Sequence, residues 1–197
     1  AKETGLGVTQ ITTNWGFWGC ITGIAGGFAA GFMSDKFFNS RRAPSAGFMQ
    51  VIMLISTALM IVCLTVQPMN AVATPEDSSL LRFFLEYRML VMGISAVTIM
   101  MAVIGVHSIM SGTATADFGG RKAAATATGI ADSFAYAGSA IQSFVIGFLA
   151  TESWSYWPMF LLPFTVLGLV FAIKMWNVIP PATRKYLEEV EKKKLGG

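Results

Sequence analysis

Five long stretches of the chain are almost free of charged side chains, and they constrain the fold more than any other feature. The Lys, Arg, Asp and Glu residues gather in short segments between these stretches and near the two ends, with Asp132 as the single exception. Crossing about 30 Å of hydrocarbon takes about 20 helical residues. The stretches are long enough for this and lie at about residues 10–33, 46–67, 89–111, 123–150 and 153–173.

The apolar residues of these stretches run on continuously, which favours helices. Strands of a membrane barrel would alternate apolar and polar side chains, and only helices or closed barrels satisfy their backbone in lipid. Apolar residues make up 54% of the chain and charged residues 13%. The sequence therefore predicts an all-α membrane protein with five transmembrane helices within residues 1–179, a charged tail at 180–197 and the lipid bilayer as its partner.

The loops differ in charge, and this predicts the orientation. Most Lys and Arg residues lie after the first and third spans and in the tail, which the positive-inside rule places in the cytoplasm. We therefore expect an integral plasma membrane protein, in a bacterium an inner membrane protein, with a cytoplasmic C-terminus. Since orientation explains the net charge of +3, no nucleic acid partner is expected. With five spans and a cytoplasmic C-terminus, the chain would begin outside the cell, and its first residue is not Met. We therefore expect that the chain is part of a longer protein.

A few polar side chains lie within the predicted spans. Ionisable groups at membrane depth are costly, so they usually face the interior of a bundle or a cavity. Asp132 and Tyr136 lie one turn apart on the fourth span, His107 near the end of the third, and Asn14 at the start of the first. For His107 and Asp132 a structural hydrogen bond or ion pair and a role in coupling a proton or a substrate both remain open.

The pattern for metal binding or catalysis is absent from the sequence. Cys20 and Cys63 lie singly in two spans, where packing explains them. The spans contain no metal-ligand spacing, no nucleophile elbow and no paired carboxylates. We expect no metal, no cofactor and no enzymatic activity.

A charged loop between the first two spans carries a recognisable motif. The segment GFMSDKFFNSRR has the form G-x-x-x-D-K-x-x-x-x-R-R and resembles the loop signature of the major facilitator superfamily. Gly31, Asp35, Lys36, Arg41 and Arg42 match that signature. The interpretation is a gate, in which Asp35 pairs with a base in one conformation and is released in another, while Gly31 allows a neighbouring helix to come close.

Two further segments narrow the resemblance. RKAAATATGIADSFAYAG at 121–138 is similar to the K-K-A-A-G-T-A-A-G stretch of the organophosphate:phosphate antiporters, and IGVHS at 104–108 is similar to their I-G-L-H. The chain then resembles helices 8 to 12 of a twelve-helix transporter, most of its C-terminal six-helix bundle. The resemblance matches Tyr136 to a Tyr of the family's helix 11 near the substrate site and His107 to a His of its helix 10. Together with the polar Asp132 and Asn14 they are the candidates for the substrate cavity. The resemblance also places the phosphate-binding Arg residues outside this chain and makes the N-terminal half a partner.

The function that this resemblance implies is secondary active transport. A sugar phosphate or glycerol phosphate would be exchanged for inorganic phosphate by rocker-switch alternating access. Cys20, Thr98 and Asp132 depart from the pattern of the glycerol-phosphate transporters, and the loop at 111–120 is longer than theirs. The alternatives are a membrane sensor for hexose phosphate of the same family and a major facilitator transporter with a different anionic substrate.

Overall fold

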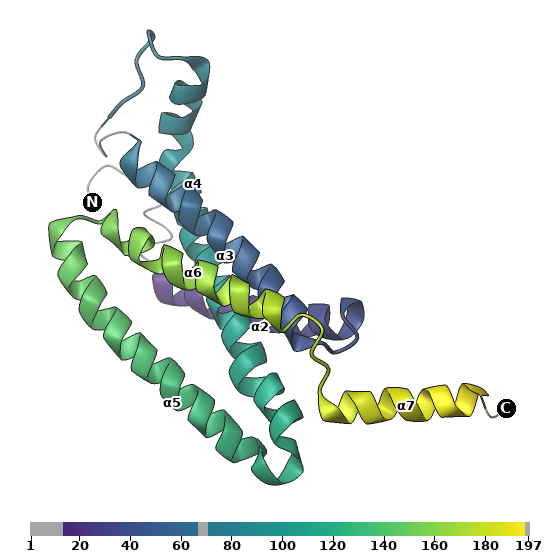
Figure 1. Cartoon of the computed structure of the whole chain (residues 1–197). Helices are drawn as coiled ribbons and strands as arrows, with labels where there is room; N and C mark the ends of the chain where they lie inside the picture. Colours follow the sequence, from purple (N-terminus) through teal and green to yellow (C-terminus); the bar gives the residue numbers. More distant parts are fainter. Residues whose placement is uncertain (1–13, 67–70, 196–197) are drawn as a thin grey trace.

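The computed structural model describes residues 14–66 and 71–195, which form helices and connecting turns without any strand. Five helical stretches within this part of the chain are long and apolar enough to cross a membrane. The prediction of an all-α membrane protein is confirmed (Figure 1). The elements are α2 (Trp15–Phe37), α3 (Arg42–Thr65), α4 (Ser79–His107), the π-helix η1 (Ser108–Ala114), α5 (Thr115–Glu152), α6 (Tyr156–Lys174) and α7 (Pro181–Leu195).

The helices start and end at other residues than the apolar stretches that predicted them. α3 begins at Arg42 and α4 at Ser79, because helical hydrogen bonding continues past the apolar residues into polar ones. Ser78 caps the start of α4, because its hydroxyl oxygen accepts a hydrogen bond from the Leu81 N–H at 3.3 Å. α7 begins with Pro181 in the charged tail, where a missing N–H costs a helix nothing. The four predicted residues 10–13 of the first span lie outside the described part.

The segment 111–120 was expected to be a loop, and this expectation is wrong. α4 continues through η1 into the first turn of α5, and the chain reverses only at Gly120, with φ 62° and ψ −177°. Such backbone angles are nearly exclusive to glycine. The sequence predicted a break of ten residues between the two helices, but in the structure Gly120 is the residue at which the helix breaks. As a result α4, η1 and α5 form a long helical hairpin (Figure 1).

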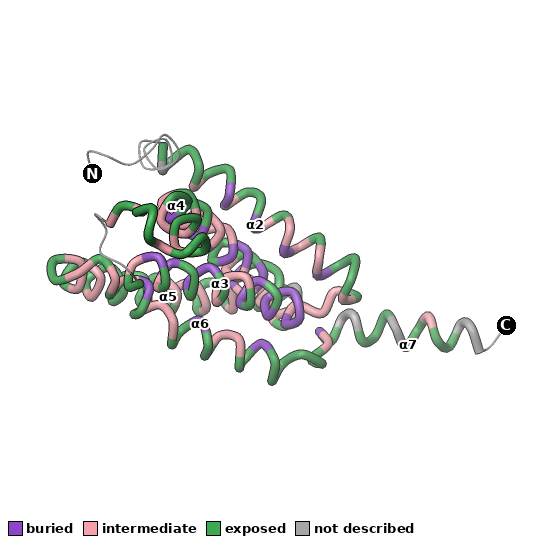
Figure 2. The backbone as a smooth tube through the Cα atoms, turned by 90° about the horizontal axis from the view of Figure 1, so that it is seen from above, coloured by how far each residue is buried: buried purple, intermediate pink, exposed green. Residues whose placement is uncertain are grey.

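The hydrophobic core lies between α2, α3 and α4. α3 packs against α4 and α6, and α2 packs against α4. The buried residues of this core are Ala30, Met49, Ala102 and Ile109. In contrast, no residue of α5 whose burial is described is buried, and Figure 2 shows the difference between α3 and α5. α5 therefore presents its length to lipid or to other protein segments.

Glycines set the spacing between α2 and α4. A Cβ atom added at Gly26 would overlap the carbonyl oxygen of Met101, and one added at Gly105 would lie 3.0 Å from the Gly26 carbonyl oxygen. Gly31, which was expected to admit a neighbouring helix, has no other atom within 4 Å of an added Cβ. The closest helix approach therefore lies at Gly26, and the expectation for Gly31 is not met.

Two sequence placements change in the structure. Arg88 was assigned to the loop before the third span, but it lies within α4 and is 3% exposed. Because α4 begins at Ser79, Arg88 lies in its third turn and not in a loop. Cys63 is buried, as expected for packing, whereas Cys20 is exposed.

Candidate functional site

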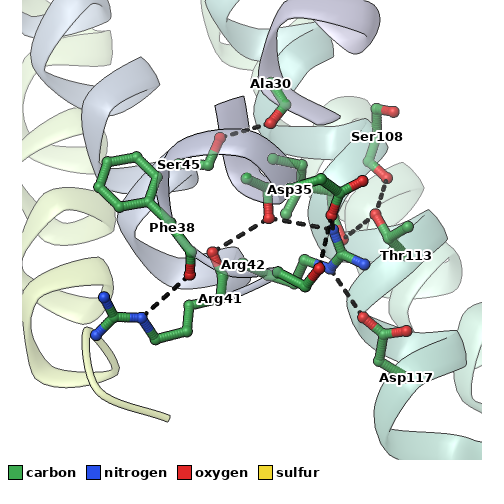
Figure 3. Close-up of polar contacts among 12 residues, drawn as sticks. Ala30, Asp35, Phe38, Arg41, Arg42, Ser45, Ser108, Thr113 and Asp117 are labelled. Carbon is green, nitrogen blue, oxygen red and sulfur yellow. Dashed lines mark hydrogen bonds and ion pairs between the residues drawn. The ribbon is translucent and has the colours of Figure 1, made fainter. Parts of the chain in front are cut away.

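Arg42 joins three helices at the end of the bundle that carries Lys36, Arg41 and Arg42, here called the basic end. Its Nη1 lies 2.7 Å from Oδ1 of Asp35 on α2, and its Nε lies 2.8 Å from Oδ2 of Asp117 on α5. Figure 3 shows the guanidinium between the two carboxylates. We call Asp35, Arg42 and Asp117 the Arg42 clamp.

The turn between α2 and α3 explains why Asp35 and Arg42 meet. α2 ends at Phe37, and the next residues include Asn39 and Ser40, with φ 51° and 60°. The Ser40 N–H then donates to the Ser34 carbonyl oxygen at 2.9 Å, a helix-ending motif in which left-handed residues reverse the chain. The Ser40 hydroxyl donates to Asp35 at 3.0 Å. The reversal places Arg42 at the first position of α3, directly beside the last turn of α2.

The shape of the guanidinium suits this position. Its donors point in fixed directions, so one Arg side chain bonds two carboxylates at once, which a Lys ammonium on a flexible stem does less well. The Arg42 side chain is 12% exposed, against 28% for Asp117 and 62% for Asp35. Solvent screens the Asp35 contact more than the Asp117 contact. The bond to Asp117 is therefore the stronger half of the clamp.

The other residues of the loop signature lie outside the clamp. Arg41 donates from Nε to the Phe38 carbonyl oxygen at 3.2 Å and approaches Asn177 at 3.5 Å. Lys36 lies over the Phe32 ring with its Nζ 5.0 Å from the ring centre. The base expected to pair with Asp35 is thus, among the described residues, Arg42.

A second polar group lies inside the hairpin of α4 and α5. The Nε2 of His107 lies 3.8 Å from Oδ1 of Asp132, and its Nδ1 lies 3.4 Å from the Ser111 hydroxyl. The Asp132 Oδ1 is buried and has no hydrogen-bond partner among the described residues. The sequence treated His107 and Asp132 as separate residues, and the structure brings them together.

Tyr136 and Asn14 are not brought into this group. Tyr136 lies one turn beyond Asp132 on α5 and is 69% exposed. Asn14 precedes α2, and its carbonyl oxygen accepts from the Trp18 N–H at 3.0 Å. Ser108, the neighbour of His107, packs against Gly27, which is about 13 residues or roughly 20 Å further along α2. Asn14 is therefore far from His107.

A cavity of about 580 Å³ lies between α3, α5 and α6 near the basic end. It is lined mainly by apolar side chains, and Gln50 contributes a buried carbonyl oxygen without a hydrogen-bond partner among the described residues. Of the candidate residues only Arg42 touches it. Neither His107 nor Asp132 is among its lining residues. Across residues 14–66 and 71–195, no cluster of His, Cys, Asp or Glu could hold a metal ion.

The sequence did not point to several of these residues. Ser34 accepts from Arg42 at 3.1 Å, and Thr115 and Thr128 place their hydroxyl oxygens 2.7 Å apart across the hairpin. Asp117 could have been found, because it lies on the same side of the membrane as Arg42 by the count of spans. The contact between Thr115 and Thr128 depends on the chain reversal at Gly120. It could not be predicted, because residues 111–120 were expected to form a loop.

Comparison with known proteins gives one informative relative. No protein-family model and no solved structure match the chain. The chain is similar to a glycerol-3-phosphate transporter. The relative comes from Bacillus subtilis (strain 168) and is 28% identical over 157 residues, which cover 79% of this chain and 30% of the relative. The chain thus spans less than a third of that relative's length. The similarity agrees with a membrane protein of the transporter class, as the loop signature indicated.

Proposed function

We propose that these helices belong to a secondary active transporter that exchanges a phosphorylated small molecule for inorganic phosphate. The observation that carries the proposal is the similarity to a glycerol-3-phosphate transporter over most of the chain. The five helices able to span a membrane support it. The proposed cargo is a sugar phosphate or glycerol phosphate, since the relative's name specifies a phosphate ester.

The proposal includes an arrangement in the membrane. Residues 1–179 form part of the C-terminal bundle of a twelve-helix transporter in the plasma membrane, with the basic end and the tail at 180–197 in the cytoplasm. The alignment with about a third of a longer transporter supports this. The exposed surface of α5 gives an N-terminal bundle a face against which to pack. Tyr136, Asp132, His107 and Asn14 line the substrate cavity at different depths.

The Arg42 clamp gives this transporter a controllable contact. Rocking of the bundles changes the spacing of helix ends, and α2, α3 and α5 are connected at their ends by one guanidinium. Each partly exposed ion pair contributes on the order of 1 kcal/mol or less. Contacts of this size are strong enough to bias two conformations and weak enough to break in every cycle.

The test is exchange by the intact transporter in lipid vesicles. Vesicles loaded with inorganic phosphate should take up labelled glycerol 3-phosphate or glucose 6-phosphate, and vesicles without internal phosphate should take up little. Uptake that does not depend on internal phosphate would contradict exchange. Binding of hexose phosphate without any uptake would indicate a sensor, and transport of another anion alone would exclude the proposed cargo.

A further inference from the structure

Two short rows of polar side chains face each other inside the α4 and α5 hairpin. His107, Ser111 and Thr115 recur every four residues on one arm, and Thr128 and Asp132 do so on the other. Thr115 meets Thr128 at 2.7 Å between hydroxyl oxygens, and His107 meets Asp132 at 3.8 Å. Residues four apart share one face of a helix. The hairpin thus contains a polar seam that leads from its turn at Gly120 to Asp132.

Asp132 is the residue of this seam whose environment is incomplete. Its Oδ1 is buried without a hydrogen-bond partner among the described residues, and a buried polar atom without a partner costs free energy. The Nε2 of His107 is 3.8 Å away, beyond hydrogen-bond distance. A proton added to the pair would supply the missing partner, either on the imidazole, which then draws the carboxylate closer, or on the carboxylate itself.

We propose that His107 and Asp132 together bind one exchangeable proton within the membrane, and that this proton enters or leaves with the transported anion. The proton comes from water at the basic end and travels along the seam of Thr and Ser hydroxyls. The proton is released to water when the transporter opens to the other side of the membrane, so no other reactant is needed. The coupling to transport rests on the proposed function, whereas the binding of the proton does not.

Charge gives the physical reason for coupling. A neutral imidazole beside a carboxylate carries one negative charge, which repels a phosphoryl anion in a medium of low dielectric constant. Binding one proton makes the pair neutral overall and removes that repulsion. Imidazole is the side chain that ordinarily changes its charge near neutral pH. Protonation of the pair therefore changes the charge that a phosphoryl anion meets.

Other titratable residues lie on the two arms of the hairpin and on the helices packed against them. Those with described side chains on α2 to α6 are Cys20, Asp35 and Lys36 on α2, Arg42 and Cys63 on α3, Arg82, Glu86, Tyr87 and Arg88 on α4, Asp117, Lys122, Tyr136 and Glu152 on α5, and Tyr156 and Lys174 on α6. Arg42 is paired with Asp117 and Asp35 in the clamp. Tyr136, one turn from Asp132, is the nearest of these along α5. The polar contacts of the His107 ring are those with Asp132 and Ser111.

Proton binding is tested directly by infrared difference spectroscopy of the purified intact protein during a change of pH. Wild type should show a carboxylic acid or imidazolium signal that is lost in Asp132→Asn and altered in His107→Gln. Glu152→Gln is the matched control, because Glu152 is an exposed carboxylate at the far end of α5, and it should retain the signal. Asp132→Glu keeps a carboxyl group and should shift the signal without removing it. A spectrum unchanged in Asp132→Asn would overturn the proposal.

Coupling is tested by phosphate exchange at several pH values in vesicles. Wild type and Glu152→Gln should exchange faster on acidification, and Asp132→Asn and His107→Gln should lose this dependence. Equal pH profiles in wild type and both variants would overturn the coupling. If wild type exchanges no phosphate at any pH, the proposed function fails, while the infrared signal still decides whether the pair binds a proton.

Discussion

The Nε of Arg42 lies 2.8 Å from Oδ2 of Asp117, although 75 positions separate the two residues in the sequence. The same guanidinium holds Asp35 at 2.7 Å. Three helix ends are thereby fixed through one side chain. Because its two partners lie on α2 and α5, with α3, α4 and η1 between them along the chain, this clamp reports on the arrangement of these helix ends.

Replacing Arg42 by Lys should loosen the basic end. A single ammonium keeps the charge but loses the fixed pair of directions, and we expect a loss of about 1 kcal/mol, or roughly fivefold in the population of the clamped arrangement. Spin labels at the ends of α2 and α5 should show longer and broader distances. Lys36→Gln is the matched control, since Lys36 lies over the Phe32 ring. Identical distance distributions in wild type and Arg42→Lys would contradict the clamp.

Gly26→Ala should separate α2 from α4. The new Cβ would overlap the Met101 carbonyl oxygen, and overpacking of this kind costs about 1–3 kcal/mol. Thermal unfolding of the detergent-solubilised protein should therefore occur at a lower temperature. Gly31→Ala provides the comparison, because its Cβ meets no other atom within 4 Å and Ala is the better helix former. If both variants unfold at the same temperature, the close approach at Gly26 is wrong.

Gly120→Ala should strain the hairpin turn. Its φ of 62° and ψ of −177° are unfavourable for a side chain by about 1–3 kcal/mol. We expect lower stability and a looser contact between Thr115 and Thr128, detectable as faster hydrogen exchange at the end of η1. Gly112→Ala is the control, since Gly112 lies in η1 with nothing within 4 Å of an added Cβ. A stability equal to that of the control would show that the chain reverses elsewhere.

Asp77 should make the turn before α4 sensitive to acid. Hydrogen bonds from the Thr74 backbone N–H and then from its hydroxyl lower the pKa of Asp77 below its ordinary value of about 3.8. With a lowered folded pKa, the stabilisation is complete above the ordinary value and is lost as the pH falls through the folded one. An NMR titration of the Asp77 carboxyl should show this, and Thr74→Val should return the pKa part of the way. An unchanged titration in Thr74→Val would contradict the hydroxyl contact.

Hydropathy was sufficient to predict the five helices that are able to span a membrane within the described residues. A backbone buried in lipid has few alternatives to a helix. Hydropathy failed at 111–120, where Ser, Gly and Thr residues suggested a loop. Their hydroxyls bond to carbonyl oxygens one turn back within the helix, as Thr115 does to Ser111 at 2.5 Å, so polarity alone did not indicate a break. Arg88 was misplaced for another reason. Its charge suggested a loop, but α4 already begins at Ser79, before the apolar residues of the span.

The candidate site was predicted as separate residues. Asp35 and Arg42 could be paired because a short turn joins them, and local geometry follows from local sequence. His107 and Asp132 could not be paired, since their contact requires the register of two helices that reverse at Gly120. Asn14 and Tyr136 are polar like His107 and Asp132, but they do not lie with them. The position of a residue in the sequence does not determine where in the bundle its side chain lies.

The sequence by itself determined that five helices able to span a membrane form within the described residues and that a charged motif lies between the first two, since both depend on the chemistry of neighbouring residues. Only the tertiary structure decided that Arg42 bonds Asp117, that α2 meets α4 at Gly26, and that an unsatisfied carboxylate oxygen of Asp132 faces His107. These contacts join distant segments through packing register and, for His107 and Asp132, through the chain reversal at Gly120, which no local pattern encodes.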